Sequence, residues 1–265
     1  MQKMIFRGSV LCLILSWAAC TKTVTLDLRN APPVFVIEGD ITDQPGPYLV
    51  RIFQTTGFYD TSNFIGVDGA TVQVSNAEGF QETLTDNGGG NYYTQQLQGK
   101  PGDTYTLSAV VSNNTYTAVS TMPQLINLNG LHIEQQFYVS KQVTYVVPDF
   151  TNPSAPDIAY YYFDQTINGN LDKAFYYWDS KFSQGEVNTF NLERSDPDST
   201  LHSGDTVTVV MQCISSDIYN YWSSLDAAAT GSGGAYPGNP ATNIIGGALG
   251  YFSAHTSRTK GLRVP

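Results

Sequence analysis

The segment from Val34 to Phe53 reads VFVIEGDITDQPGPYLVRIF, in which two apolar-rich runs flank a turn sequence. In the tetrad Gln44 to Pro47, proline occupies the second position and glycine the third; proline presets φ, and glycine tolerates a positive φ. The chain is therefore expected to reverse between Val34–Ile37 and Tyr48–Phe53, which become the first two strands.

The residues after Phe53 continue this succession of short strands and turns. Ala70–Val74 alternates with a two-residue period, so that Val72 and Val74 face opposite to Thr71 and Gln73. Further strands are predicted at Gly79–Leu84, Asn91–Thr94, Asp103–Val110 and Tyr116–Ser120, with turns in Asp86–Gly90 and Ser112–Thr115. About seven short strands with turns between them are typical of an Ig-like or transthyretin-like β-sandwich. We expect this sandwich over residues 32–123.

After Pro123 the sequence has longer aromatic-rich runs, and we expect a second β-rich domain over residues 124–265. Its strand candidates are Ala159–Phe163, Ala174–Trp178, Val207–Ile214 and a late, buried strand at Ile244–His255. Gly246 to Gly250 satisfies G-x-x-x-G in a short segment flanked by polar residues, which favours close strand packing over a membrane helix interface.

One short helix is predicted in the second domain, near residues 216–229. Its apolar side chains fall at positions i, i+3, i+4 and i+7, which places them on one face. They are Ile218, Tyr221, Trp222 and Leu225. Ser215, Ser216 and Asp217 are candidate N-caps, and Gly231 can end the helix. We expect the apolar stripe to pack against the second sheet.

The first 19 residues have the order of an export signal. Lys3 and Arg7 precede a short apolar run that contains no acidic residue and is far shorter than the roughly 20 residues that span a bilayer. Ala18 and Ala19 stand directly before Cys20, as in the lipobox of bacterial lipoproteins. We therefore expect a signal peptide over 1–19, lipidation at Cys20 and a tether over 20–31. An ordinary secretory signal with a nearby free cysteine is the alternative.

The remaining cysteines and the histidines give no sign of a disulfide framework or a metal site. Cys12 leaves with the signal, and Cys213, alone in an apolar strand, is expected to be a small buried hydrophobe. One cysteine and three scattered histidines lack the ligand spacing of a metal cluster. Asp86–Asn87 and Asp196–Asp198 are oxygen donors of the kind calcium prefers, but the same residues are ordinary in turns. We predict no cofactor.

The charge balance is strongly acidic. The chain has 13 Lys and Arg against 23 Asp and Glu, and removal of Lys3 and Arg7 with the signal leaves a mature net charge near −12. Such a surface repels phosphate backbones, so nucleic acid is not an expected partner. Charged residues make up only 14% of the chain, below the roughly 25% that is usual in soluble domains. Uncharged polar and aromatic residues instead fit the exposed faces of sheets in an extracytoplasmic protein.

No catalytic constellation is visible in the sequence, and we expect a non-catalytic protein. Glu38 lies in a predicted strand without an identifiable carboxylate partner, so its expected role is that of an exposed, solvating side chain. An enzyme with an unrecognised site stays open as an alternative. Carboxylates that converge in a cleft would favour it.

Aromatic clusters suggest one further function. Sugars stack on exposed tyrosine and tryptophan, so Tyr176, Tyr177 and Trp178 are candidate glycan-binding residues. Alternation places half of each aromatic run in a sheet core, however, and a structural role is the competing interpretation.

Several stretches together resemble one known family. They are Val36–Tyr48, Gly69–Val72, Thr117–Pro123, Tyr221-Trp222 and Asn239–Phe252. They keep the order found in the domain-of-unknown-function 4249 family of Bacteroidota outer-membrane lipoproteins. The resemblance implies an outer-membrane-associated lipoprotein, often encoded near TonB-dependent receptors, and brings no catalytic residues with it.

The sequence and the resemblance together predict a lipid-anchored outer-membrane protein that is accessory to a TonB-dependent type of uptake complex. Its expected partners are the membrane, through the lipid on Cys20, and an outer-membrane receptor or transporter. A glycan-binding surface lipoprotein is the alternative. Whether the protein faces the periplasm or the cell surface stays open, because Thr21-Lys22-Thr23 lacks the acidic cluster that directs some lipoproteins outward.

Overall fold

The computed structural model describes residues 32–56, 64–138, 141–194, 200–231 and 238–265. The described residues from Pro33 onward belong to one compact unit. The predicted signal peptide, Cys20 and the tether lie outside the described residues. The described part of the chain is mainly β with one helix, as the sequence predicts.

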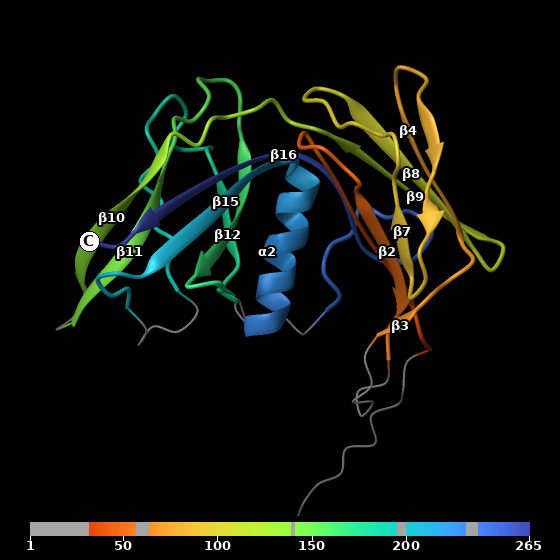
Figure 1. Ribbon diagram of the computed structural model, residues 1–265. Coiled ribbons are helices and arrows are strands. Elements are labelled where there is room, and N and C mark those ends of the chain that lie inside the picture. Colours follow the sequence, from red (N-terminus) through yellow and green to blue (C-terminus); the bar gives the residue numbers. More distant parts are fainter. Residues whose placement is uncertain (1–31, 57–63, 139–140, 195–199, 232–237) are drawn as a thin grey trace, which may run out of the picture. The chain divides into compact units, whose positions relative to one another are not determined.

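Sixteen strands and one helix occupy the described ranges (Figure 1). The first half contains β1 (Phe35–Thr42), β2 (Leu49–Gln54), β3 (Ile65–Gly66), β4 (Thr71–Asn76), β5 (Gln81–Thr83), β6 (Thr85–Asp86), β7 (Asn91–Tyr93), β8 (Thr104–Val111) and β9 (Asn114–Thr121). The second half contains β10 (Gly130–Tyr138), β11 (Lys141–Asp149), β12 (Tyr160–Ile167), β13 (Asn170–Leu171), β14 (Tyr176–Asp179), β15 (Thr206–Ile214), α2 (Ser216–Thr230) and β16 (Leu249–Arg263). All seven strands predicted before Pro123 are present.

The largest sheet contains strands from both predicted domains. Its strand order is β13-β12-β15-β16-β1-β2-β7-β6, with β14 beside β12 and β3 beside β2. β1 pairs with β2 in the antiparallel sense, so the chain reverses after β1 as Pro45 and Gly46 predict. The other neighbour of β1 is β16, which runs parallel to it, with Val36 opposite Leu249 and Thr42 opposite His255. The domain boundary at Pro123 therefore stays a prediction, while one continuous sheet joins the two halves.

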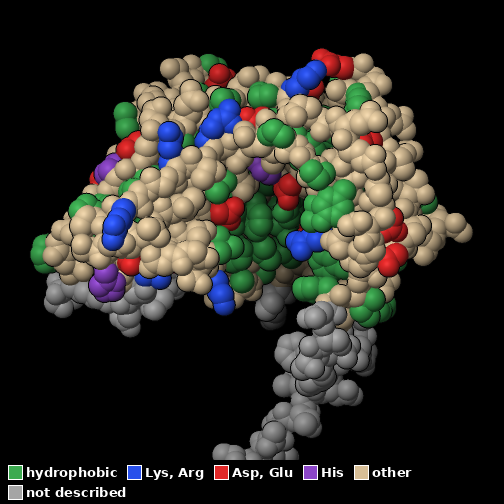
Figure 2. Space-filling model, in the orientation of Figure 1, with side chains coloured by type: hydrophobic (Ala, Val, Ile, Leu, Met, Phe, Trp, Pro, Cys, Tyr) green, Lys and Arg blue, Asp and Glu red, His purple; other side chains and the backbone are tan. Residues whose placement is uncertain are grey.

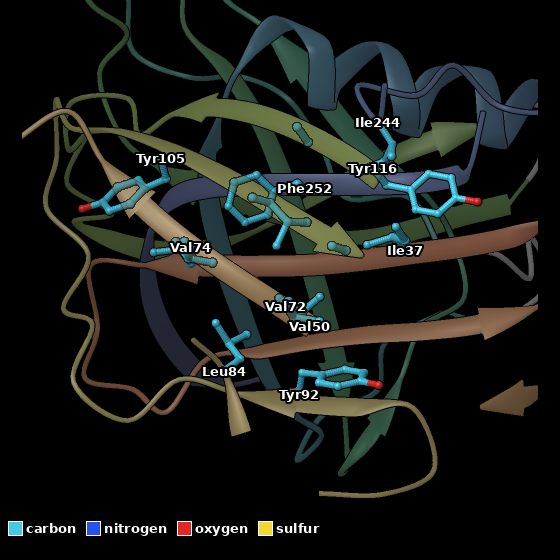
Figure 3. Close-up of a cluster of buried hydrophobic side chains, with 14 of the residues drawn as sticks. Ile37, Val50, Val72, Val74, Leu84, Tyr92, Tyr105, Tyr116, Ile244 and Phe252 are labelled. Atoms are coloured by element: carbon cyan, nitrogen blue, oxygen red, sulfur yellow. The ribbon is translucent and has the colours of Figure 1, made fainter. Parts of the chain in front are cut away.

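The first hydrophobic core lies between this sheet and a second sheet of order β5-β4-β8-β9 (Figure 3). Two-residue alternation supplies the core from each strand, for example Ile37 from β1, Val72 from β4 and Leu107 from β8. β16 contributes Phe252 and Ala254, both fully buried. The sandwich of the first half is thus completed by a strand from the end of the chain.

A second core belongs to the other half. It gathers the inward side chains of β12 and β15, including Tyr161, Phe163 and Met211, with Val146 of the hairpin β10–β11. Cys213 is buried in the same core with a free thiol, and its burial raises the pKa of the thiol. The predicted role of Cys213 as a small buried hydrophobe is confirmed.

The predicted helix is α2, which ends at Gly231 in the left-handed conformation, with φ 68°. Ser215 is the N-cap residue, although its side chain makes no capping hydrogen bond. Ile218 and Tyr221 are buried, and α2 packs against β12, β14 and β16 (Figure 1). The apolar stripe does pack against the large sheet.

The late strand differs from its predicted bounds. Ile244 is buried in the first core but precedes β16, which begins at Leu249 and continues to Arg263. Gly246 and Gly247 have φ of 117° and 90°, which is incompatible with an extended strand. At Gly250, a Cβ atom would lie 2.1 Å from the carbonyl oxygen of Ile37. The glycine there permits the close strand approach that the sequence predicts.

Candidate functional site

The face of β1 and β16 that points away from the first core is polar. In β1, Ile37 and Ile41 enter the core, and the alternation turns Glu38 and Asp40 to the opposite face. In β16, burial of Phe252 in the core places Tyr251 on this same opposite face. The parallel register sets Glu38 beside Tyr251.

α2 and β12 bring further side chains to this face. Together they form a site that we call the acidic–aromatic hollow. Its residues, linked by hydrogen bonds, ring contacts or charge interactions, are Glu38, Asp40, Asp164, Tyr221, Trp222 and Tyr251. Figure 2 shows this side of the molecule hollowed where α2 lies, with hydrophobic side chains lining the hollow and acidic ones beside them.

Asp40 is the central acid of the hollow. Burial raises the pKa of Asp40 to about 6, against the opposing effects of a hydrogen bond from Tyr251 and the charge of Arg51. The Tyr251 hydroxyl donates to Oδ2 of Asp40 over 3.1 Å. The Asp40 side chain nevertheless keeps 45% of its accessible surface. It is therefore surrounded by protein but still open to a solute.

Glu38 and Asp164 flank Asp40. Burial, followed by the charge of Asp40, raises the pKa of Glu38, although Arg51 Nη2 donates to Glu38 Oε2 over 2.8 Å and opposes this shift. Burial and the charge of Asp40 also raise the pKa of Asp164, which accepts a hydrogen bond of 3.1 Å from Gln212. The expected role of Glu38 as an exposed side chain without a carboxylate partner is wrong, because its side chain is only 22% accessible and the charge of Asp40 acts on it.

Aromatic rings form the other side of the hollow. The ring of Tyr221 lies 4.7 Å from that of Tyr251, and Trp222 lies 5.5 Å from Tyr251, between ring centroids. Trp222 also stacks on Tyr162, with centroids 4.2 Å apart and planes 17° apart. Burial and the charges of Glu38 and Asp40 raise the pKa of Tyr221 to about 12. These neutral phenols keep their hydroxyl protons at physiological pH.

His255 lies at the edge of this polar face and is uncharged at neutral pH. Burial lowers its pKa to about 4, against the charge of Asp43. Its Nδ1 lies 3.0 Å from Ser253 Oγ and 3.7 Å from Asp40 Oδ1. The uncharged imidazole therefore adds no positive charge beside Asp40.

Within the described ranges, no group of three or more His, Cys, Asp or Glu side chains is arranged to hold a metal ion. Asp86 instead accepts the backbone N–H groups of Gly69 and Gly88, at 2.7 and 2.9 Å, which is the behaviour of a turn residue. The other calcium candidate, 196–198, lies outside the described residues. None of the described residues form a helix that is both long and apolar enough to cross a membrane.

The structure separates the three predicted glycan-binding aromatics. Tyr176 is buried in the second core, where its hydroxyl accepts a hydrogen bond from Gln165. Tyr177 packs edge-on against Tyr219 of α2 and donates to Asp226 over 3.0 Å. Tyr176 is thus buried and Tyr177 is partly buried.

Trp178 is the exposed member of the three, with 36% of its surface accessible. Its ring stacks on Phe190 with centroids 4.8 Å apart. Both rings line a shallow surface groove together with Phe175, Asn191 and Glu193. Tyr176 also lines this groove, although its side chain is buried, and the glycan interpretation of the three residues stays a prediction.

The fold and the hollow define a mainly β protein in which the acidic, aromatic-lined site lies on the face of the large sheet away from the first core, beside the one described helix. The family model described as Domain of unknown function (DUF4249) matches residues 21–261, and the chain belongs to this family. Comparison with curated proteins gives no match.

Proposed function

We propose that this chain is a non-catalytic binding protein of the cell envelope that holds a cationic organic ligand in the acidic–aromatic hollow. The observation that carries the proposal is the state of Asp40, which is enclosed enough to have its pKa raised to about 6 yet keeps 45% of its side chain accessible. Ionisation of a carboxyl group in such a place is unfavourable in the ligand-free protein, because burial removes part of its hydration. A bound cation would offset that cost.

The neighbours of Asp40 support a ligand with a positive charge. The charge of Asp40 contributes to the raised pKa of both Glu38 and Asp164, so Asp40 repels each of these carboxyl groups when they are ionised. The rings of Tyr221 and Trp222 add the negative faces of their π systems, which attract cations within about 6 Å. Protonated amines and guanidinium groups combine both requirements.

A hydrolytic role is less well supported by the same residues. Enzymes that use paired carboxylates hold one acid with a raised pKa and one carboxylate that stays ionised. In the hollow, the pKa values of Glu38, Asp40 and Asp164 all shift upward. Asp43, whose pKa is lowered, is instead engaged with Arg258 and the backbone of Ser257.

Calorimetric titration of the mature protein tests the proposal. The titrants are arginine amide, putrescine and choline, with glucose and galactose as neutral comparisons. We expect an amine to bind and the neutral sugars not to. Binding should weaken as the pH falls through about 6, because protonation removes the charge of Asp40.

Matched variants locate the site. Asp40→Asn and Trp222→Ala should each weaken amine binding by about tenfold or more, equivalent to about 1.4 kcal/mol. Asp157→Asn removes an exposed carboxylate outside the hollow and should leave binding unchanged. Equal binding by the wild type and the Asp40→Asn variant would rule the hollow out as the site.

The location and partner belong to the same proposal. Two or more acyl chains on Cys20 would anchor the protein stably, since each buried CH₂ contributes about 0.8 kcal/mol. The protein would then act at the outer membrane beside a TonB-dependent type of receptor, in a Bacteroidota envelope. This part is supported by the lipobox-like Ala18-Ala19-Cys20 and by the resemblance of the chain to that group of lipoproteins.

Two experiments address anchor and partner separately. Labelling with a fatty-acid probe should be lost in Cys20→Ala, and continued labelling would show that Cys20 is not the lipidation site. Crosslinking in intact cells followed by pull-down should recover an outer-membrane receptor. Recovery of no such receptor would remove the uptake complex from the proposal and leave ligand binding to be judged by calorimetry.

Glycan binding is a second candidate, carried by the exposed stack of Trp178 on Phe190. On a glycan array, the protein should bind through this surface, and Trp178→Ala should abolish the signal. Tyr176→Phe keeps the buried ring and serves as the control. An array without any bound glycan would eliminate this candidate.

A further inference from the structure

Phe64 and Ile65 form an exposed apolar pair at β3. Their accessible fractions are 69% and 59%, and no other two consecutive large hydrophobic residues in the described ranges are comparably exposed. The ring of Phe64 rests on Phe53, with centroids 4.8 Å apart. Ile65 is therefore positioned by its pairing in β3, and Phe64 by its contact with Phe53.

The pair lies close to the point where the N-terminal segment enters the fold. Ile65 pairs with Gln54, and Gln54 pairs with Phe35, the first residue of β1. Neighbouring strands are about 4.8 Å apart, so Ile65 lies roughly 10 Å from Phe35 across the sheet. Cys20 is connected to this same end of β1 by the chain.

The length of the connecting segment limits how far the fold can lie from a lipid on Cys20. Residues 20–31, even fully extended, would reach about 40 Å at 3.3–3.6 Å per residue. The start of β1 is thus the part of the fold with the shortest connection to the membrane. An apolar pair beside that point is well placed to meet the bilayer.

We infer that Phe64 and Ile65 insert into the lipid interface of the membrane that carries the anchor. The inference rests on the proposed lipidation of Cys20. A bilayer is the partner we favour for this apolar pair, because a lipid on Cys20 would keep the bilayer close to the start of β1. Aromatic and aliphatic side chains also suit the boundary between headgroups and acyl chains. The acidic net charge of the chain offers no electrostatic attraction to anionic lipids, so apolar contact is the attractive term here.

Insertion has a consequence for the hollow. Phe53 and Phe64 line a surface depression that also includes Glu38 and Arg51. Glu38 belongs to the acidic–aromatic hollow, so insertion of Phe64 would hold this edge of the hollow near the lipid surface. The ligand would then enter or leave close to the membrane.

The test uses residues 21–265 with a histidine tag in place of the signal and Cys20. Vesicles of phosphatidylethanolamine and phosphatidylglycerol with a nickel-chelating lipid supply the attachment. Ile65→Cys is labelled with an environment-sensitive NBD fluorophore, while buried Cys213 remains unlabelled in the folded protein. Phe182→Cys, at a position where the native side chain is 91% exposed, is the matched control.

Attachment to vesicles should shift the emission of the label at position 65 to the blue and allow its quenching by spin-labelled lipid, with little change at position 182. A double variant, Phe64→Ser with Ile65→Ser, should dissociate about tenfold faster from vesicles of low nickel-lipid content. That factor corresponds to about 1.4 kcal/mol. Equal responses at positions 65 and 182, or no response at 65, would overturn insertion.

The tag makes this result independent of the anchor. Failure of insertion on tagged vesicles would refute only the role of Phe64 and Ile65. Failure of the Cys20→Ala labelling experiment would refute only the lipid anchor. The two outcomes are therefore distinguishable.

Discussion

The hydroxyl of Tyr251 donates a hydrogen bond of 3.1 Å to Oδ2 of Asp40, although the two residues are 211 positions apart in the sequence. The bond joins neighbouring parallel strands, β1 and β16, on the face opposite the first core. It also connects Asp40, whose side chain is 45% accessible, to one of the aromatic residues that line the hollow. Both the fold and the candidate site thus depend on the same strand pair.

Asp40→Asn is expected to stabilise the protein at pH 8. The pKa of Asp40 is raised in the folded state to about 6, above about 3.9 for an unfolded chain. The native state therefore favours the protonated form, and the fold loses stability as the pH rises through about 6. Asparagine carries no charge, so its advantage should shrink as the pH falls towards 4.

Urea denaturation at pH 4, 6 and 8 measures this effect. Asp157→Asn, at an exposed position, should show no comparable dependence on pH. If Asp40→Asn were less stable than the wild type at pH 8, the charge of Asp40 would be stabilising in the ligand-free protein. The central observation behind the proposed function would then be lost.

Asp43→Ala is expected to lower stability at pH 7 by about 1.5–3 kcal/mol, as for hydrogen bonds to charged groups. Asp43 has a side chain only 7% accessible, and it accepts bonds of 2.7 Å from Arg258 and 2.9 Å from the N–H of Ser257. Burial opposes ionisation of Asp43, but these bonds outweigh it and lower its pKa.

The pH dependence of the Asp43 contribution runs in the opposite direction to that of Asp40. Because the folded pKa of Asp43 is lowered, its contribution is complete above the unfolded value of about 3.9 and disappears as the pH falls through the folded value. In urea denaturation, the stability difference between wild type and Asp43→Ala should therefore be constant from pH 6 to 8 and shrink below pH 4. A difference that grows on acidification would contradict this assignment.

Phe252→Ala should cost about 3–5 kcal/mol of unfolding free energy. Its ring is fully buried in the first core and comes from β16. Phe182→Ala, at a site 91% exposed, should change stability by less than about 0.5 kcal/mol. Chemical denaturation of both variants at equal protein concentration compares them directly, and similar losses would argue that β16 does not complete the sandwich.

Gly250→Ala should destabilise the protein by about 2–5 kcal/mol, since it combines a strained backbone with steric overlap. The φ angle of Gly250 is 95°, and a Cβ atom would lie 2.1 Å from the carbonyl oxygen of Ile37. Gly169→Ala is the control for strain alone, with φ 82° and no atom within 4 Å of the added Cβ. It should cost only about 1–2 kcal/mol, as measured by thermal or urea unfolding.

The strands and α2 were predictable because their signals are local. Alternating apolar residues define β4 and β8, and glycine or asparagine turns separate the strands. The parallel pairing of β1 with β16 has no such signal, because no tight turn connects parallel strands. The two strands are far apart in the sequence, so a pattern within one short stretch of residues cannot predict that they pair.

The hollow was missed for the same reason. Alternation correctly sets Glu38 opposite the core of the sandwich, but it does not say what covers that opposite face. The contacts of Tyr221 and Trp222 with Tyr251 supply the answer only in three dimensions. Alternation is equally incomplete for β14. Tyr176 and Trp178 lie on one face of this strand, yet only Tyr176 is buried.

The position of β16 also bears on how the protein matures. Synthesis from the N-terminus delivers β1 long before Leu249–Arg263. Until β16 arrives, β1 has an open edge and the first core lacks Phe252, so pairing must wait for contacts distant in the sequence, which are slow to form. A chain that stops before Leu249 would keep that edge exposed. Only a chain that includes β16 can pair the open edge of β1, so the large sheet forms completely only after Leu249–Arg263 has been synthesised.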